Sequence, residues 1–274
     1  MLLAGKYKLG ERIGKGAFGQ IYDCVDVNTG RKLAIKQQPD SNEYEYRVLL
    51  SLRETGVVPK TMMYFESDDD AEEKASYLCM QKMSMDLRGL SKCRKIDRRL
   101  LLALSVKLFG ALKKIHDRGW IHRDIKPGNI MFGDDDVVVY LIDFGLAKKY
   151  CSDGGMHIPF MKNKSTVVGT AKYLSRWCHE HVQQSRRDDC ASLMYTVVQV
   201  GKGKLPWGRE ASKDPKEKMR RIFTMKRTTT PEELCEGMPR SFRRIMRCVD
   251  SLGFEQRPEY SKYQRYLLED WARL

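Results

Sequence analysis

The sequence lacks any apolar run of the ~18 uninterrupted residues that a membrane-spanning helix requires. Its longest candidate, residues 100–115, is broken by three lysines. The first six residues, MLLAGK, hold too short an apolar region for a signal peptide. We therefore expect neither a membrane span nor a secretory leader.

The eight cysteines also lack the Cys-x-x-Cys spacing that is typical of zinc sites and redox centres. Scattered thiols of this kind indicate reduced, structural side chains and not a disulfide framework. The cysteine pattern therefore predicts a cytoplasmic or nuclear protein.

Negative charge is in short supply, because 36 Asp and Glu stand against 50 Lys and Arg, a formal net charge of +14. Such a field attracts nucleic acid, anionic membrane or acidic protein, and charge alone does not choose among them. With 42% hydrophobic and 31% charged residues the chain is expected to be globular. Its 274 residues suffice for one large or two-lobed domain.

The most informative stretch is residues 121–129, with the sequence IHRDIKPGN, between a helical pattern and an apolar run. Charged and turn-forming residues at such a junction indicate a loop held by rigid neighbours. A surface turn is the simpler interpretation of these nine residues alone. However, His, Arg and Asp, then Lys two and Asn five residues after the Asp, are in the order of a protein-kinase catalytic loop.

Glycines at positions 14, 16 and 19 lie between predicted strands in residues 7–36. Without side chains, the backbone there can lie close over phosphates. A Gly-x-Gly-x-x-Gly motif alone also fits a hairpin or a dinucleotide site. Here the following strand ends on residues 33–36, LAIK, which is the kinase order. Lys36 is therefore predicted to contact the α- and β-phosphates of a nucleotide.

A carboxylate is needed to hold Lys36 in place, and the predicted helix at residues 41–53 offers Glu43 and Glu45. Counting back from residues 56–59, GVVP, favours Glu45. This helix and the strands around it predict a small lobe.

Predicted strands and helices divide the chain into two lobes. Residues 7–82 are expected to form a small lobe of antiparallel strands with one helix, and residues 87–274 a large helical lobe. Residues 83–86 would be the hinge region, and a long helix at residues 101–115 leads into the catalytic loop. The sequence thus predicts an α+β, bilobal protein kinase fold in a single domain, residues 1–274.

A second hairpin is predicted at residues 130–142, and it ends on Asp143-Phe144-Gly145. Hard Mg²⁺ prefers oxygen ligands together with nucleotide phosphates, which Asp143 and Asn129 supply. We interpret the three aspartates at positions 134–136 as a solvated turn, because consecutive carboxylates on a turn point in different directions.

The catalytic roles follow from the chemistry of phosphoryl transfer, in which the protein orients the nucleophile and neutralises charge on the transferred group. Asp124 is expected to orient the substrate hydroxyl or accept its proton, and Lys126 to reach the γ-phosphate. Asp189, on the next helix, is expected to brace the loop backbone. The predicted catalytic residues are Lys36, Glu45, Asp124, Lys126 and Asn129.

The predicted nucleotide site lies around the glycine loop and Lys36. Met80 either limits the depth of an adenine pocket there or is an ordinary core methionine. The residues predicted to contact ATP are Ile13, Gly14, Lys15, Gly16, Ala17, Phe18, Gly19, Gln20, Ile21, Ala34, Lys36, Met80 and Asp143.

Where most protein kinases carry Ala-Pro-Glu, the activation segment has the sequence GTAKYLS at residues 169–175. Further distinctive stretches are LIDFGLAKKY at residues 141–150, HIPF at 157–160, QSRRDD at 184–189 and KLPWG at 204–208. Together they closely resemble the casein kinase I family, over residues 7–254. The resemblance implies a constitutively competent, non-specific Ser/Thr kinase that uses Mg²⁺ and ATP. It also implies a preference for acidic or already phosphorylated protein substrates.

In that family, basic residues near the activation segment bind an anion, and the matching positions here are Lys172, Arg209 and Lys218. Lys172 stands where the family usually has Arg and lacks its bidentate geometry, so phosphate priming is expected to be weaker. Gly208 is displaced by one residue, and Gly128 replaces an acidic residue. None of these departures removes a catalytic group.

The leading hypothesis is therefore a monomeric, ATP-dependent Ser/Thr protein kinase. A catalytically weak basic module that docks acidic or phosphorylated partners is the alternative, although the intact catalytic residues argue against it. Nucleic-acid binding would suit the charge, but no reading motif or aromatic stacking series is recognisable, so no sequence-specific binding is expected. Tyrosine specificity is disfavoured because Lys126 follows Asp124 in the Ser/Thr-kinase arrangement.

Overall fold

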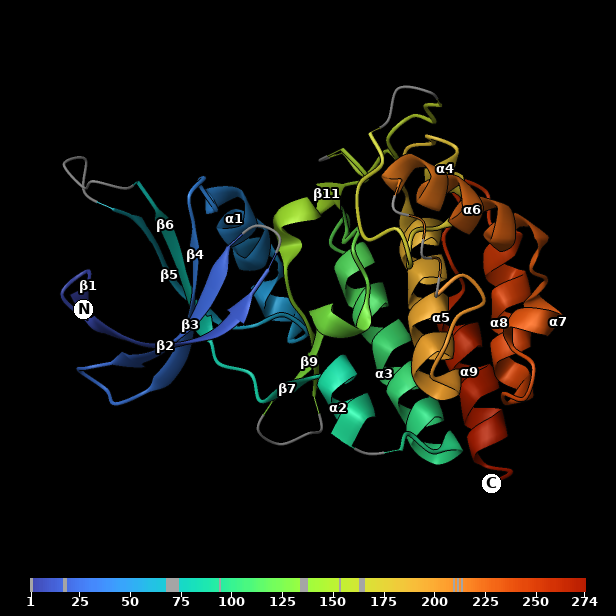
Figure 1. The fold of residues 1–274 in the computed structure, drawn as a ribbon, viewed down its shortest axis with the longest axis horizontal. Helices are drawn as coiled ribbons and strands as arrows, with labels where there is room; N and C mark the ends of the chain where they lie inside the picture. Colours follow the sequence, from blue (N-terminus) through green and yellow to red (C-terminus); the bar gives the residue numbers. More distant parts are fainter. Residues whose placement is uncertain are drawn as a thin grey trace. The chain divides into compact units, whose positions relative to one another are not determined.

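The chain divides into two compact units, Met1–Met85 with Met131–Gly145, and Asp86–Ile130 with Leu146–Leu274 (Figure 1). The computed structural model describes residues 2–16, 19–67, 74–93, 95–133, 138–152, 154–162, 166–208, 210, 212 and 214–274. The predicted lobes assigned everything after residue 87 to the large lobe, whereas residues 131–145 belong to the first unit. Pairing explains the difference, because the amide of Leu141 donates a 2.8 Å hydrogen bond to the carbonyl oxygen of Val57.

An antiparallel sheet dominates the first unit, with the strand order β1-β2-β3-β4-β6-β5 among the described residues. Its strands are β1 (Leu2–Leu3), β2 (Tyr7–Lys15), β3 (Gln20–Asp26), β4 (Lys32–Gln38), β5 (Thr61–Glu66) and β6 (Ser76–Gln81). Leu33 and Ile35 of β4 join a buried cluster with Tyr77 of β6. Because side chains alternate along a strand, Ala34 and Lys36 point to the opposite face.

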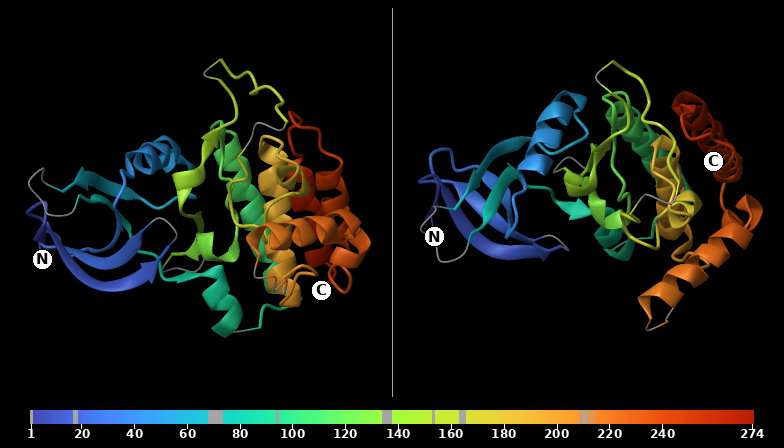
Figure 2. Two further views of the ribbon diagram at one scale, coloured as in Figure 1. Left: turned by 45° about the horizontal axis from the view of Figure 1, so that its top comes forward. Right: turned by 90° about the horizontal axis from the view of Figure 1, so that it is seen from above.

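The first unit has a single long helix in its described part, α1 (Glu43–Leu52), as predicted within two residues. It buries Glu45, Val48, Leu49 and Leu52, which recur at the three- and four-residue spacing of one helix face. Both views in Figure 2 show α1 alongside the sheet, where it packs against β5 and β6. A short 3₁₀ turn, η1 (Arg53–Thr55), ends at Gly56 with a left-handed φ of 65°.

A smaller sheet, with the order β10-β9-β7, carries the chain toward Asp143. It consists of β7 (Met85–Asp86), β9 (Ile130–Phe132) and β10 (Val139–Leu141), and the turn η3 (Phe144–Leu146) follows. The predicted hairpin at residues 130–142 is confirmed in these two strands. The aspartates at 134–136 lie outside the described residues.

The second unit is mainly helical. Its helices are α2 (Leu87–Cys93), α3 (Arg98–His116), α4 (Arg176–His179), α5 (Arg186–Lys202), α6 (Pro215–Thr228), α7 (Pro231–Leu234), α8 (Arg240–Asp250) and α9 (Tyr260–Trp271). Residues 187–198 of α5 are buried on all sides, since the helix packs against both α3 and α8. On the other side of α3 lies α9, and the rings of Phe109 and Tyr263 meet edge to face at 5.4 Å.

Three short elements flank the catalytic loop. Strands β8 (Trp120–Ile121) and β11 (Lys148–Lys149) pair antiparallel, and η2 (Pro127–Asn129) ends the loop. Among the described residues, no helix combines the length and apolar character that a membrane crossing requires. The sheet of the first unit and the helices of the second confirm the predicted α+β class.

Candidate active site

Lys36 is the centre of a buried ion cluster in the first unit. Only 6% of this residue is exposed, and its Nζ lies 2.6 Å from Glu45 Oε2 and 2.8 Å from Asp143 Oδ1. The other candidate, Glu43, instead pairs with Arg47 at the surface. Burial alone would lower the pKa of Lys36, but the charges of Glu45 and Asp143 outweigh it, and the pKa is raised. Lys36 therefore remains a cation at neutral pH.

Glu45 and the backbone after Asp143 are also connected. The second oxygen of Glu45, Oε1, accepts a 2.9 Å hydrogen bond from the amide of Phe144, whose side chain is fully buried. Asp143 itself has a left-handed φ of 66°, which costs a non-glycine residue about 1–3 kcal/mol. Such a conformation persists only where surrounding contacts fix it. Here the ion pair with Lys36 and the hydrogen bond from the next amide to Glu45 fix it.

One face of the sheet brings several predicted nucleotide-site residues together. Ile21 is the cross-strand neighbour of Lys36, and Met80 is that of Ala34. Ile13 on β2 leaves 51% of its surface exposed, and its contact with ATP stays a prediction. Lys15 and Gln20 are cross-strand neighbours on β2 and β3, one position along from the pair of Gly14 and Ile21. Because side chains alternate along a strand, they lie on the face opposite that of Ile21 and Lys36.

The glycines at positions 14, 16 and 19 differ in how much space a side chain would have there. A Cβ at Gly19 would lie 2.1 Å from the carbonyl oxygen of Gln37, so β4 approaches too closely for any side chain. At Gly14 and Gly16 the nearest atoms would be 3.5 Å and 3.8 Å away. Backbone packing thus explains Gly19, and phosphate contact stays a prediction for the other two. Ala17 and Phe18 lie outside the described residues.

In the second unit, four donors contact the carboxylate of Asp124, and three of them come from Lys126 and Thr170. Its Oδ2 lies 2.6 Å from Lys126 Nζ, and its Oδ1 accepts from the amide and hydroxyl of Thr170, at 2.9 Å and 2.7 Å. Lys126 also donates to the Thr170 hydroxyl, at 3.1 Å. A carboxylate fixed in this way is suited to accept a hydrogen bond from a hydroxyl group.

Gly169 allows the activation segment to reach Asp124. It has a φ of 113°, and a Cβ there would lie 2.4 Å from the carbonyl oxygen of Arg123. The neighbouring hydroxyl of Thr170 can therefore meet the catalytic loop.

Asp189 on α5 braces the catalytic loop, as predicted. Its Oδ2 and Oδ1 accept from the amides of His122 and Arg123, at 2.7 Å and 2.9 Å. His116 Nε2 lies 3.0 Å from the same carboxylate. Burial alone would raise the pKa of Asp189, but its bond to His116 and the loop amides hold it below its usual value. The loop backbone, where Arg123 has a φ of 69°, is thus fixed by a buried anion.

Asn129 is oriented by the same loop. Its Nδ2 donates to the carbonyl oxygen of Asp124 at 2.9 Å and to its Oδ2 at 3.2 Å. The amide oxygen is left as the atom that suits a hard cation. Asn129 belongs to the second unit and Asp143 to the first, so their sharing of a metal ion stays a prediction. No group of three or more His, Cys, Asp or Glu in the described part of the chain forms a metal site by itself.

The family model of the protein kinase domain matches residues 7–266. The chain belongs to the protein kinase domain family. Members transfer phosphate from ATP, with a divalent metal ion, to protein substrates. The sheet-rich first unit and the helical second unit are the two lobes of this fold, as the sequence predicted.

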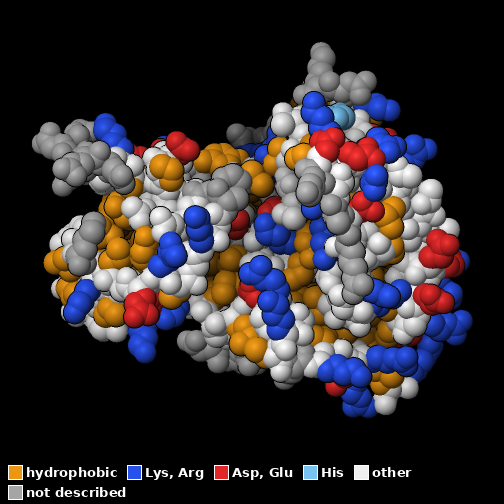
Figure 3. All heavy atoms as spheres, in the orientation of Figure 1, with side chains coloured by type: hydrophobic (Ala, Val, Ile, Leu, Met, Phe, Trp, Pro, Cys, Tyr) orange, Lys and Arg blue, Asp and Glu red, His pale blue; other side chains and the backbone are white. Residues whose placement is uncertain are grey.

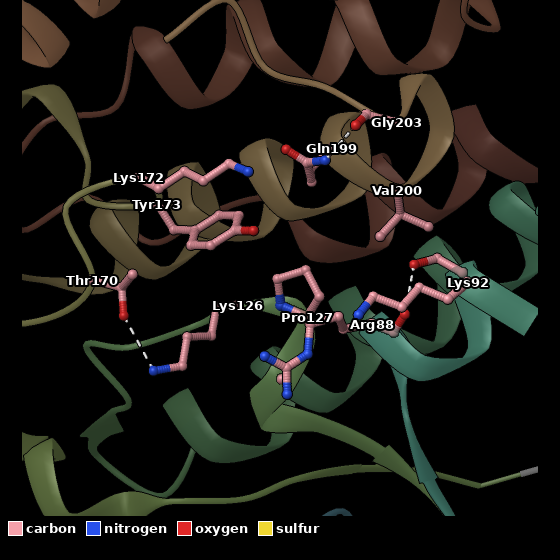
Figure 4. Close-up of a pocket in the computed structure, with 12 residues that line it drawn as sticks. Arg88, Lys92, Lys126, Pro127, Thr170, Lys172, Tyr173, Gln199, Val200 and Gly203 are labelled. Carbon is pink, nitrogen blue, oxygen red and sulfur yellow. Dashed lines mark hydrogen bonds between the residues drawn. The ribbon is translucent and has the colours of Figure 1, made fainter. Parts of the chain in front are cut away.

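A basic cavity of about 620 Å³ lies beside the catalytic loop of this kinase domain (Figure 4). Lys172 and Tyr173 line one side and Arg88 and Lys92 of α2 another, while Lys126 points toward Thr170. The residues lining it are Arg88, Ser91, Lys92, Lys126, Pro127, Gly128, Thr170, Lys172, Tyr173, Gln199, Val200 and Gly203. Four of them are basic, and none is acidic. Burial lowers the pKa of Lys172.

The predicted anion residues are only partly in this cavity. Lys172 lines it, whereas Lys218 is exposed on α6 and is not among the lining residues. Arg209 lies outside the described residues. The structure therefore brings Lys172 together with Arg88 and Lys92 in this cavity, which Lys218 does not line.

Thr170, Arg88 and Lys92 are site residues that the motifs did not predict. A hydroxyl directly after a glycine of the activation segment is the one sequence signal for Thr170. Basic residues at exposed positions of a helix are too common for Arg88 and Lys92 to be singled out.

Proposed function

We propose that this kinase is of the casein kinase I type and transfers the γ-phosphate of Mg²⁺-bound ATP to Ser or Thr in acidic or phosphorylated proteins. The activation segment supports the casein kinase I type, since residues 169–175 lack Ala-Pro-Glu and residues 184–189 and 204–208 match that family's pattern. The basic cavity beside Asp124 is the single observation that carries the substrate preference.

The loop geometry supports a hydroxyl acceptor. Asp124 would orient the substrate hydroxyl and receive its proton, because its carboxylate is held by Lys126 and Thr170. Lys126 places a positive charge within 2.6 Å of that carboxylate, where charge on the transferred group also needs neutralising. When bound, Mg²⁺ and ATP supply the phosphoryl group and a cation for its oxygens. Lys36, held by Glu45, would bind the remaining phosphates.

The cavity favours an anion because four basic residues and no acidic residue line it. Lys126 is also paired with Asp124 and Arg88 with Asp86, so Lys172 and Lys92 are the two lining cations without a carboxylate partner among the described ion pairs. Figure 3 shows Lys and Arg side chains spread over the visible face, so net charge alone does not mark a site. In the cavity, by contrast, Lys126, Lys172, Arg88 and Lys92 converge from three separate segments. Charge-assisted hydrogen bonds from such groups are the usual way to bind phosphate or carboxylate.

Gly128 lines this cavity without adding a charged side chain to it. A Cβ at this position would lie 3.7 Å from Asp86 Oδ2 and 3.9 Å from the guanidinium carbon of Arg88. The casein kinase I family usually has an acidic residue here, which would reach toward Arg88. Its absence leaves more positive charge for a substrate, which supports the preference for acidic peptides.

Radiolabelled phosphate transfer onto two matched peptides tests the proposal. One carries phosphoserine three residues before the acceptor serine, and the other carries serine there. We expect about tenfold faster transfer to the primed peptide, because its phosphate gains charge-assisted hydrogen bonds. Lys172→Gln should remove most of this preference and leave transfer to the serine peptide nearly unchanged.

Two further enzymes serve as controls. Asp124→Asn is the blank, and Lys95→Gln removes an exposed positive charge outside the cavity. Equal transfer to both peptides, or the same loss of preference in Lys95→Gln, would contradict the role of the cavity. Transfer no greater than the blank would contradict the kinase activity and favour a basic docking module.

A further inference from the structure

Lys226 on α6 is a buried lysine that no known part of the catalytic site explains. Only 4% of it is exposed. Its Nζ donates to the carbonyl oxygens of Ala171 and Leu174, at 2.8 Å and 2.6 Å, and lies 3.2 Å from His179 Nε2. An ammonium group has three N–H donors, so these three acceptors match its capacity. Among the described residues, no carboxylate pairs with it.

Aromatic rings enclose the same ammonium group. Nζ lies 5.2 Å from the ring centre of Tyr195 and 5.3 Å from that of Trp207, and both rings are buried. Cation–π attraction at these distances partly replaces the water that burial removes. Three acceptors and two rings therefore surround the ammonium group, while Nδ1 of His179 has no hydrogen-bond partner in the described part of the chain.

Trp207 extends this anchor along the activation segment. Its indole Nε1 donates to the carbonyl oxygen of Lys172 at 2.8 Å. Side chains of Lys226 and Trp207 thus take three of the four carbonyl groups of residues 171–174. Residues 171–174 form no helix or strand, so these side-chain hydrogen bonds to their carbonyl groups hold the segment in place.

The anchored segment is the one that faces the substrate. Thr170 precedes it and contacts Asp124, while Lys172 and Tyr173 line the basic cavity. We propose that Lys226 is a positioning residue, which fixes residues 171–174 so that Thr170 and Lys172 are held in place for the protein substrate. The nature of that substrate rests on the proposed function, but the anchor itself does not.

Lys226→Met tests this role, because it keeps the length of the side chain and removes all three donors. We expect the KM for the peptide substrate to rise about tenfold to a hundredfold, with a smaller change in kcat. The dissociation constant of ATP should stay within about twofold, since Lys36 and Glu45 belong to the other unit. Hydrogen exchange of peptides covering residues 169–175 should become faster.

A matched control is Lys216→Met, which removes an exposed lysine from the same helix and should change none of these quantities. The proposal is overturned if Lys226→Met leaves both the peptide KM and the exchange at residues 169–175 unchanged. It is also overturned if Lys216→Met changes them equally.

A second pair of variants decides the question if Lys226→Met does not fold. His179→Gln keeps an acceptor at the position of Nε2 for Lys226, whereas His179→Phe removes it. The first should keep the peptide KM near that of the unmodified chain and the second should raise it, and equal values would refute the anchor. If the unmodified chain transfers no phosphate, the proposed function fails, while hydrogen exchange still tests the anchor.

Discussion

Two lysines of this kinase are almost equally buried, but one has charged partners and the other has neutral ones. Lys36, in the first unit, has two carboxylate partners, at 2.6 Å and 2.8 Å. Lys226, in the second unit, has two backbone carbonyls and an imidazole nitrogen. The carboxylates raise the pKa of Lys36, whereas burial lowers the pKa of Lys226 well below its ordinary value. The chemical surroundings, and not burial itself, thus decide what a buried lysine does.

The different partners suit Lys36 to binding phosphate and Lys226 to holding the backbone in place. A lysine between two carboxylates keeps a full charge, which is available to an incoming phosphate. A lysine between carbonyl groups and aromatic rings has its donors occupied by the backbone that it holds. Substitutions at the two sites should therefore damage different steps, and the following experiments measure that separation.

The largest expected effect is on Lys36. Lys36→Met should lower kcat about 100- to 1000-fold, because a fixed charge is removed from the site where charge on phosphate is neutralised. Phosphate transfer at saturating ATP and peptide measures this loss, and circular dichroism verifies the fold. If Lys36→Met raised only the peptide KM, as is expected of Lys226→Met, the two lysines would not have the different roles assigned to them.

Local patterns were enough to predict the Lys36 site. The motif order predicted Lys36, and counting back from residues 56–59 favoured Glu45 over Glu43. In the structure, Lys36 lies on the face opposite the buried cluster of Leu33 and Ile35, and Glu45 is buried. The motif order in residues 121–129 likewise identified Asp124 and the loop that Asp189 braces. In these cases short stretches contain the relevant information.

Residues joined over long distances in the chain were not predictable in this way. Thr170 contacts Asp124 across 46 residues, and Lys226 reaches Ala171 across 55. A lysine between Met225 and Arg227 on an amphipathic helix resembles any solvated surface residue in the sequence. Only tertiary packing shows that its ammonium group is buried. The same reason applies to residues 131–145, whose pairing with the first unit depends on a distant carbonyl at Val57.

Glu45→Gln provides a second, smaller test of the Lys36 site. It leaves Lys36 with Asp143 but removes one buried charge and weakens the bond to the amide of Phe144. We expect the free energy of unfolding to fall by about 1–3 kcal/mol. Glu43→Gln is the matched control two residues away, because its pair with Arg47 is exposed and is worth less than about 0.5 kcal/mol. Urea unfolding of both variants measures the difference, and equal losses would contradict the buried ion cluster.

The smallest effect concerns pH at the Lys226 site. Burial, followed by the charge of Lys226, lowers the pKa of His179 from 6.5 to about 3. A histidine with a lowered pKa in the folded state contributes stability above pH 6.5, which is lost as pH falls toward 3. The Lys36 pair has the opposite sign, because a raised pKa gives stability that is present throughout this range and is lost only above 10.5.

Between about pH 8 and about pH 6, the unmodified chain should therefore lose about 1 kcal/mol more stability than His179→Gln. Gln keeps an acceptor at the position of Nε2 for Lys226 but does not titrate, so this variant removes the pH dependence of the site and retains the anchor. Urea unfolding at the two pH values measures the difference. An equal loss in both proteins would mean that His179 is solvated and free to protonate, and the ammonium group of Lys226 would then share its pocket with a second cation. That outcome would remove the contrast between the two lysines, because Lys226 would need a carboxylate just as Lys36 does.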